Sequence, residues 1–529
     1  MKKRWIKIFK KLHKWPAIVI SFFALLFAAS GIVMNHRDIV SSVNVSRKFM
    51  PPTYTYNNWN LAAVRGSVSA GQNEQLIYGN IGIWKTNNES NQFTDFNQGL
   101  PKGIDNRKIY SIVAFENHFF AGTHFGLFTR NQNGKNWQRV DLPVREQRIA
   151  DLNLKEDTLL VLTRHYLLKS VNGTDFKKNQ LPVPVGYQRK TGMFDTLWQL
   201  HSGELWGMPG KLIVDLLGLV TILLSVTGLL HFFFPKIIKR KKKKIKKKNA
   251  PTELPQTPKE DSTKAVQNLI KTKKKNLRWH NVVGYIFALF LIINTFSGMH
   301  LRPPLLIAIA SKQVGIIPGT HLDSPNPWFD KLRRVQWDEN LQRYIFSTSE
   351  GFYLAEESLT EPLQPAFSQP PVSVMGCNVL KPLGKSSYLV GSFSGMFVWN
   401  VPSGLVTDFF NQQPYVKPEG MVKPISDHMV AGLVEVKNNT FWFDYNNGAR
   451  GITSFGNLPT FPQMPEEITD ASPMSLWNVA LEFHTGRIFE YLIGPFYILY
   501  VPLAGICILL VLISGLYLWW KLHRKKTRY

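Results

Sequence analysis

The chain alternates long apolar runs with long, mainly polar segments. Four runs reach membrane-spanning length: about Trp15–Met34, Lys211–Phe234, Val282–Met299 and Pro495–Trp520. A helix of about 20 apolar residues crosses the ~30 Å hydrocarbon core of a bilayer. The pattern therefore predicts an integral membrane protein with four transmembrane helices that contact the lipid bilayer.

The two long polar segments have a different pattern, in which short apolar stretches alternate with Gly, Asn and Pro turns. A loose unit, glycine or tyrosine followed by aromatic and aliphatic residues and a polar turn, recurs about every 40–45 residues, the repeat length of four-stranded propeller blades. Examples start at Gly82, Gly126, Tyr166, Gly351 and Gly395. Both segments are predicted to be all-β and propeller-like, with six or seven blades in total.

These patterns predict a membrane α + β fold. The layout expected along the chain is: 1–36, lead and first transmembrane helix; 37–195, first extracytoplasmic β segment; 196–235, second transmembrane helix; 236–278, basic cytoplasmic linker; 279–300, third transmembrane helix; 301–470, second β segment; 471–522, fourth transmembrane helix with an amphipathic lead; 523–529, basic tail. Within the linker, 249–265 is rich in proline and polar residues and is predicted to be flexible.

The spans occur as two similar pairs. His13 lies 17 residues before Ser30-Gly31, and His280 lies 17 residues before Ser297-Gly298. The second and fourth spans are entered through His201-Ser-Gly and His484-Thr-Gly, and Ser225/Gly228 and Ser514/Gly515 lie deep inside them. We therefore predict two parallel repeats, roughly 1–240 and 275–529, related by an axis along the membrane normal.

The formal net charge of +27 is concentrated in four short stretches, 1–14, 236–248, 271–278 and 523–529. All four lie on one side if the chain crosses the membrane four times. This positive-inside pattern predicts cytoplasmic termini, periplasmic β segments and a bacterial inner-membrane location. The charges also suit anionic lipid headgroups. A nucleic-acid function is not predicted, because no folded domain accompanies these charges.

Several cofactor classes lack their sequence signatures. The chain has two cysteines and no Cys-x-x-Cys spacing, which argues against c-type haem and iron–sulfur clusters. It also lacks the Gly-x-Gly-x-x-Gly fingerprint and a Walker loop. Electrons for any redox reaction would therefore have to come from a quinol or from a cytoplasmic partner.

The histidines at the ends of the spans suggest a haem protein. Haem b is held without covalent attachment by axial side-chain ligands such as histidine. The repeat places His13 and His280 at one depth, and His201 and His484 at another. We predict that the first pair ligates an inner haem and the second an outer haem. The alternative is that these are ordinary interfacial histidines, half-wetted at the lipid headgroups.

Other candidates have weaker support. His36, His231 and His300 lack an equivalent histidine in the other half, although His36 or His300 remains an alternative outer ligand. Arg487 is a candidate partner for a haem propionate. The remaining six histidines are expected on surfaces or in turns: His118, His124, His165, His321, His428 and His523.

Asp215 lies inside the second span, where a carboxylate is by default a functional candidate. Either it pairs with Lys211, four residues earlier on the helix, or it handles protons. Seven glycines are expected to allow close helix packing or to admit a flat macrocycle: Gly31, Gly218, Gly228, Gly284, Gly298, Gly505 and Gly515.

The order and spacing of these histidines and glycines resemble the PepSY-associated transmembrane family. The resemblance rests on His13 with Ser30-Gly31, on 201–203, on the recurrence of the first pattern at His280, and on 484–487. It covers the four spans and their flanks. Family members usually carry small α/β PepSY modules outside the membrane, whereas these outer segments have a β-repeat pattern.

Some members of that family are inner-membrane reductases that pass electrons through two haem b groups to ferric siderophores. The resemblance therefore implies a haem-dependent transmembrane electron carrier with a periplasmic ferric chelate as acceptor. The alternative, from a different functional class, is a non-enzymatic membrane-anchored β scaffold that recruits an envelope partner.

Overall fold

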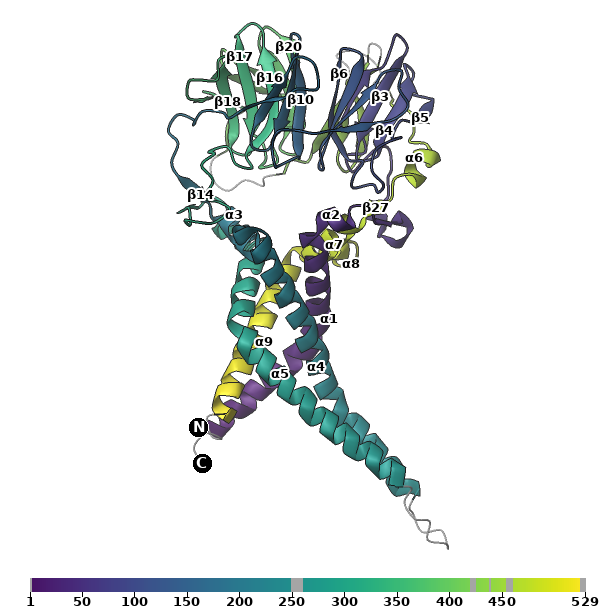
Figure 1. The fold of residues 1–529 in the computed structure, drawn as a ribbon, viewed down its shortest axis with the longest axis vertical. Coiled ribbons are helices and arrows are strands. Elements are labelled where there is room, and N and C mark those ends of the chain that lie inside the picture. Colours follow the sequence, from purple (N-terminus) through teal and green to yellow (C-terminus); the bar gives the residue numbers. More distant parts are fainter. Residues whose placement is uncertain (1, 249–259, 419–424, 437–438, 453–459, 524–529) are drawn as a thin grey trace. The chain divides into compact units, whose positions relative to one another are not determined.

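The computed structural model describes residues 2–248, 260–418, 425–436, 439–452 and 460–523 (Figure 1). The chain forms two compact units, and each is built from separated stretches of sequence. The helical unit comprises Met1–Arg37, Lys190–Asp323 and Trp477–Tyr529. The β unit comprises Asp38–Arg189 and Ser324–Leu476.

Four long helices dominate the helical unit: α1 (Lys2–Asn35), α4 (Gly207–Lys248), α5 (Glu260–Met299) and α9 (Tyr500–His523). Each contains a stretch long and apolar enough to cross a membrane. Helices α1 and α5 each contact both α4 and α9, so the four form a bundle. The prediction of four membrane-spanning helices is confirmed by the length and apolar composition of these helices.

Short elements precede two of the long helices. They are α3 (Met193–Ser202) and η3 (Glu204–Trp206) before α4, and α7 (Leu476–Thr485), η5 (Arg487–Phe489), α8 (Glu490–Ile493) and η6 (Gly494–Leu499) before α9. After α5 come η4 (Leu305–Ala308) and β15 (Gln313–Gly315), which pairs with β14 (Lys190–Gly192).

Much of the segment predicted as a basic linker is helical. Helix α4 continues through the lysine-rich run to Lys248, and α5 begins at Glu260. Lysine and arginine are good helix formers, so these sequences extend the apolar helices instead of ending them. Of the stretch predicted to be flexible, 249–259 falls outside the described residues and the remainder is the first turns of α5.

Among its described residues, the β unit contains six antiparallel meanders, each of strands consecutive in sequence, and one two-stranded sheet. The first sheet is formed by β2 (Gly66–Ser69), β3 (Glu74–Gly79), β4 (Gly82–Asn87) and β5 (Phe93–Asp95). The second is formed by β6 (Ile109–Phe115), β7 (His118–Thr123), β8 (Leu127–Asn131) and β9 (Gln138–Val140). The third is formed by β10 (Ile149–Lys155), β11 (Thr158–Thr163), β12 (Leu167–Ser170) and β13 (Lys177–Asn179).

The second half of the unit has the same arrangement. Its sheets are β16 (Leu332–Asp338), β17 (Arg343–Thr348), β18 (Gly351–Glu356) and β19 (Gln364–Pro365); β20 (Val379–Gly384), β21 (Ser387–Ser392), β22 (Gly395–Asn400) and β23 (Leu405–Asp408); and β24 (Val430–Val436), β25 (Asn439–Asp444) and β26 (Gly448–Ile452). Short elements flank the sheets: α2 (Arg37–Val40), η1 (Arg47–Phe49), η2 (Pro52–Tyr54), α6 (Glu466–Asp470), and β1 (Asn44–Val45) paired with β27 (Met474–Ser475). The all-β prediction is confirmed.

The buried side chains of the β unit gather between neighbouring sheets. Five clusters lie between sheets consecutive in sequence, and a sixth joins the last sheet to the first, where Val434 and Phe443 pack with Ile77 and Trp84. Each sheet thus buries both faces, which explains the near-continuous apolar strands such as β11.

Polar contacts also join these sheets. Arg334 on β16 donates to the carbonyls of Cys377 and Asn378, just before β20, at 3.1 and 2.5 Å. The same guanidinium lies 3.4 Å from Asp151 on β10.

His165 is predicted to lie on a surface or in a turn. It lies in a turn but is buried, and its Nδ1 accepts the backbone N–H of Asp330.

Trp399 provides a test of this packing. It is fully buried between the fourth and fifth sheets, and its indole N–H donates to the Ser368 carbonyl at 2.9 Å. Trp399→Ala should destabilise the β unit by about 3–5 kcal/mol, because it leaves a large cavity. The measurement is the thermal midpoint of the strand circular-dichroism signal of the intact protein. Phe367→Ala is the control, since Phe367 is fully exposed, and equal midpoints for the two variants would contradict this packing.

Candidate functional site

The four candidate ligand histidines meet in two pairs, one at each end of the bundle. The rings of His13 on α1 and His280 on α5 have centroids 6.2 Å apart. The rings of His201 on α3 and His484 on α7 have centroids 6.0 Å apart. The structure therefore brings together the same partners that the sequence pattern suggested.

We call His13 and His280 the inner pair. The Nδ1 atom of each ring forms a hydrogen bond with another helix. His13 Nδ1 lies 2.9 Å from the Val511 carbonyl and 3.4 Å from Ser514 Oγ, both on α9. His280 Nδ1 lies 2.9 Å from Thr227 Oγ1 on α4. Thr227 donates its own hydroxyl to the Leu223 carbonyl, so its oxygen accepts from the imidazole.

We call His201 and His484 the outer pair. Their Nδ1 atoms also form hydrogen bonds with other helices. His201 Nδ1 lies 3.0 Å from the Asn294 carbonyl on α5, and Asn294 Nδ2 donates back to the His201 carbonyl at 2.9 Å. His484 Nδ1 lies 3.0 Å from Ser30 Oγ on α1, whose hydroxyl donates to Leu26. In all four rings Nδ1 carries the proton, which leaves the lone pair of Nε2 free. Metal-ligating histidines are characteristically oriented by such a bond from the second ring nitrogen.

Each imidazole also lies against a glycine of a different long helix. A Cβ atom built on Gly31 would lie 3.5 Å from His484 Cε1, and one on Gly228 would lie 3.4 Å from His280 Cε1. The fit is tighter at the other two positions. A Cβ on Gly515 would lie 3.0 Å from His13 Cε1, and a Cβ on Gly298 would lie 2.7 Å from His201 Nδ1.

The glycine of each His-(Ser/Thr)-Gly motif has a separate structural role. Gly203 and Gly486 end α3 and α7 in the left-handed conformation, with φ of 81° and 76°. A Cβ on Gly203 would also lie 2.5 Å from the carbonyl carbon of Gly210, and one on Gly486 would lie 2.7 Å from Tyr500 Cγ. These turns let a short helix present its histidine just before the membrane-spanning helix begins.

The separation of the paired rings suits a single iron atom between them. Two metal–nitrogen bonds of ~2 Å and two ring radii of about 1.1 Å add to about 6 Å. Among the described residues, no group of three or more His, Cys, Asp or Glu is placed to hold a metal ion.

The family model for the PepSY-associated TM region matches residues 1–234 and 256–521. The chain belongs to this family. The resemblance seen in the spans therefore extends over nearly the whole sequence, including the β unit. A comparison with curated protein sequences gives no match.

Among solved structures, the chain is weakly similar to the extracellular domain of the putative hybrid two-component system BT4673 from B. thetaiotaomicron. The identity is 8%, the TM-score is 0.34, and the match covers 74% of this chain but only 33% of that one. The WD40 β-propeller domain of Doa1 matches with 8% identity and a TM-score of 0.31, over 76% of this chain and 98% of that one. Such low scores do not establish a shared fold.

The other candidate histidines of this PepSY-associated transmembrane protein lie outside the two pairs. His36 Nε2 is 2.7 Å from Asp215, and Asn35 Nδ2 donates to the same carboxylate at 3.0 Å. His300 bonds through Nδ1 to the Phe296 carbonyl of its own helix, at 2.8 Å. Neither is placed as an outer ligand in this arrangement.

His231 differs from these two because it lies near the inner pair, within electrostatic range of both His13 and His280. Its Nδ1 is buried, with no hydrogen-bond partner among the residues that the structure describes. His231 therefore lies at the same end of the bundle as His13 and His280.

One predicted charge interaction is formed with another partner. Lys211 pairs with Glu204, at 2.7 Å, and not with Asp215, which is bound to Asn35 on α1 and to His36 just after it. A break in the helix at Gly207 places Glu204 within reach of the lysine. Arg487 lies 2.5 Å from Glu482. An anion at this end would therefore compete with Glu482 for the Arg487 guanidinium.

A second arginine at this end of the bundle was not singled out from the sequence. Arg302 lies within electrostatic range of Arg487, Glu482 and His484. Burial, and then the charge of Arg487, lower the pKa of its guanidinium from the usual value, although arginine stays protonated at neutral pH. Two guanidinium groups near His484 would favour an anionic ligand group there.

Part of the anchoring differs from the predicted pattern. The pattern pairs Ser225 with Gly228, whereas Thr227 is the residue that bonds to His280. The corrected pattern is a hydroxyl residue followed directly by glycine in every span: Ser30-Gly31, Thr227-Gly228, Ser297-Gly298 and Ser514-Gly515. This dipeptide could have been found from sequence. The remaining three glycines, Gly218, Gly284 and Gly505, face aliphatic or methionine side chains and serve helix packing.

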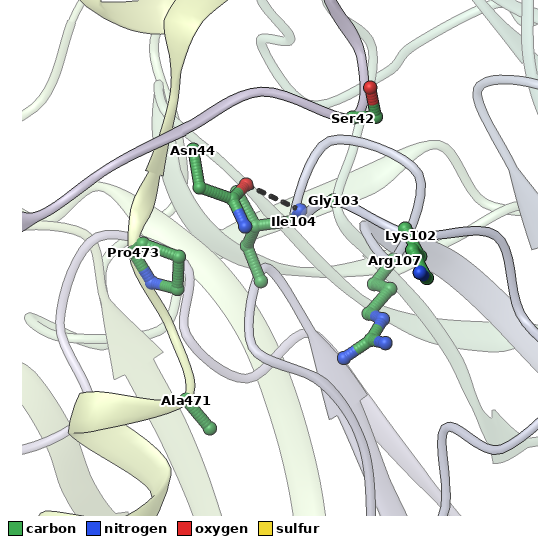
Figure 2. Close-up of a pocket in the computed structure, with 8 residues that line it drawn as sticks. All are labelled: Ser42, Asn44, Lys102, Gly103, Ile104, Arg107, Ala471 and Pro473. Atoms are coloured by element: carbon green, nitrogen blue, oxygen red, sulfur yellow. Dashed lines mark hydrogen bonds between the residues drawn. The ribbon is translucent and has the colours of Figure 1, made fainter.

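A separate pocket of about 320 Å³ lies in the β unit beside β1 (Figure 2). It is lined by Ser42, Asn44, Lys102, Gly103, Ile104, Arg107, Ala471 and Pro473. Asn44 Oδ1 accepts the backbone N–H of Ile104 at 3.0 Å and fixes the pocket wall. The charged side chains in this lining are both cationic. The pocket contains none of the predicted site residues.

The histidine–glycine contact can be tested by adding a single methyl group. Gly298→Ala should destabilise the helical unit by about 1–3 kcal/mol, because the new Cβ overlaps the His201 ring. Gly284→Ala is the matched control, since its Cβ would lie 3.6 Å from Leu224 in ordinary contact. The thermal midpoint of the helical circular-dichroism signal should fall only for Gly298→Ala. Equal midpoints would show that the glycine does not receive the ring.

Proposed function

We propose that this protein is a di-haem b electron carrier that moves electrons across the inner membrane to a periplasmic acceptor. The observation that carries the proposal is the pairing of four histidines at two ends of one bundle, with ring centroids 6.0 and 6.2 Å apart. One haem would be held by His13 and His280, and the other by His201 and His484.

The surroundings of the rings fit such a cofactor. Each imidazole has its proton on Nδ1 and is fixed from a neighbouring helix, so Nε2 can ligate without a change of tautomer. Each glycine receives one of these rings, so the space that a side chain would fill is taken by the imidazole. When bound, haem supplies reversible one-electron chemistry. The chain's own contribution is to hold two such groups at different depths in an apolar bundle.

The outer end has the charge expected for a haem with exposed carboxylates. Arg302 lies near both His484 and Arg487, and its side chain is half-buried. A guanidinium group binds carboxylates with good geometry. We assign these two arginines to the propionates of the outer haem.

The acceptor that suits this arrangement best is a ferric chelate such as a ferric siderophore. A single electron reduces Fe(III) to Fe(II), which is a poorer match for hard oxygen ligands, so the metal is released. The β unit would provide the extracytoplasmic surface for this acceptor. The packing of the sixth sheet on the first supports the interpretation that its sheets close into a six-bladed propeller-like ring.

The histidine–glycine contacts support the parallel repeat on which the haem positions rest. His13 lies on Gly515 and His280 on Gly228, while His201 lies on Gly298 and His484 on Gly31. Each histidine of one half thus contacts a glycine of the other half, and every contact has a counterpart with the halves interchanged.

Ligand substitutions separate the two proposed haem sites. His201→Ala should remove about half of the b-type absorbance in the dithionite-reduced minus oxidised spectrum, and His13→Ala should remove the other half, because each leaves the opposite pair intact. His300→Ala, whose ring bonds to its own helix, should keep the full signal.

Full absorbance in both ligand variants, at equal protein content, would overturn the ligand assignment. A protein without b-type absorbance after growth with ample haem would contradict the electron-transfer function and favour the membrane-anchored scaffold.

A further inference from the structure

Beyond the spans, α4 and α5 form an extended pair of helices with strongly basic surfaces. We call this the basic arm and define it by 236–248 of α4 and 260–279 of α5, which lie side by side in Figure 1. Its described side chains are 236–245 and 264–279. These include thirteen Lys or Arg residues and no Asp or Glu. All thirteen are exposed except Lys273, which is half-buried.

The basic arm is a continuation of the bundle and is connected to the inner histidine pair. Asn276 Nδ2 donates to the Thr227 carbonyl at 2.8 Å, and the Thr227 hydroxyl receives His280 Nδ1. Phe234 and Val266 are buried along the helices. The cationic surface therefore begins within two turns of helix from a proposed electron-transfer site.

The length of the basic arm argues against anionic lipid as its only partner. In α5 the apolar part from His280 to Met299 already spans about 30 Å, the thickness of the hydrocarbon core. The part from Glu260 to Trp279 adds about 30 Å more along the same unbroken helix. Attraction to a lipid surface falls off within a Debye length of about 8 Å at physiological salt. The far end of the basic arm, near Lys264, thus lies beyond the reach of the headgroups, whereas the cations nearest the spans can also contact lipid.

We propose that the basic arm is the docking surface for an acidic, soluble one-electron carrier that supplies electrons to the inner site. This inference rests on the proposed function, in which the electrons must enter at the end of the bundle that holds His13 and His280. The donor's reduced cofactor loses one electron per encounter, this chain gains it, and the oxidised donor dissociates.

The charge pattern suits that kind of partner. Weak electron-transfer complexes bury small interfaces and depend on rapid, electrostatically steered association. A surface with thirteen cations and no anion among its described side chains raises the local concentration of an acidic protein and selects against basic ones. Its lysine-rich flanks also predict a cytoplasmic position, where soluble carriers are found.

The test uses the full-length protein in nanodiscs of zwitterionic lipid and reduced flavodoxin, an acidic one-electron donor, as the probe. The variant Lys239→Gln/Arg240→Gln/Lys243→Gln/Lys244→Gln removes four charges from the basic arm. The control Arg4→Gln/Lys7→Gln/Lys10→Gln/Lys11→Gln removes four exposed charges from α1. Stopped-flow absorbance gives the rate of haem reduction, and fluorescence anisotropy of labelled oxidised flavodoxin gives binding without any redox step.

We expect the basic-arm variant to slow reduction by flavodoxin at least tenfold and to weaken its binding to a similar extent, with little change in the α1 control. Added salt should abolish the difference. Reduction by dithionite should be the same in all three proteins. Equal flavodoxin rates and affinities for the two variants would overturn the inference. So would a basic arm whose only charge-dependent binding is to vesicles containing phosphatidylserine.

The binding measurement keeps this inference separate from the proposed function. If no haem is present but flavodoxin still binds to the arm in a salt-dependent way, the docking surface stands and the electron-transfer function fails. If haem is present and reducible by dithionite but flavodoxin binds the basic-arm variant as tightly as the wild-type protein, the docking inference alone fails.

Discussion

The helical unit depends on one contact that occurs four times, an imidazole seated on a glycine of a neighbouring helix with its Nδ1 bonded there. The contact requires a residue without a side chain beneath the ring and a hydrogen-bond acceptor beside the ring. Glycine meets the first requirement. A serine or threonine hydroxyl, or a backbone carbonyl of the helix, meets the second. A glycine in an exposed helix interior costs about 0.5–1 kcal/mol relative to alanine. Its use at these positions is explained by the ring that it receives.

The same contact determines which ring nitrogen remains available to bind a metal ion. Because every Nδ1 donates its proton, every Nε2 keeps its lone pair, and the rings meet in pairs at two depths of the bundle. The surrounding polar groups are then divided between the ends. His36, Asn35 and Asp215 tie the end of α1 to α4, whereas Arg302 adds positive charge near His484 and Arg487 pairs with Glu482. Under the proposed function, the first group is structural and the second interacts with the cofactor.

Local patterns made much of this predictable. The four spans follow from the lengths of the apolar runs. The His13/His280 pair follows from the equal spacing to Ser30-Gly31 and Ser297-Gly298, and the His201/His484 pair follows from the shared His-(Ser/Thr)-Gly motif. The β unit follows from its turn-separated apolar strands. What could not be predicted depends on contacts distant in sequence. Asp215 binds α1 and not its helical neighbour Lys211, because Glu204 lies closer to that lysine in space. The helical continuation of the basic run was missed because high charge was taken to indicate a linker, although lysine has good helix propensity.

The central claim is that the two histidine pairs each hold one haem b. The most direct measurement combines the pyridine haemochrome content of the purified wild-type protein with its electron paramagnetic resonance spectrum in the oxidised state. The account predicts two haem b groups per chain, both low-spin, because each iron would have two imidazole ligands. A single haem per chain, or a high-spin signal from an iron with only one imidazole, would contradict it.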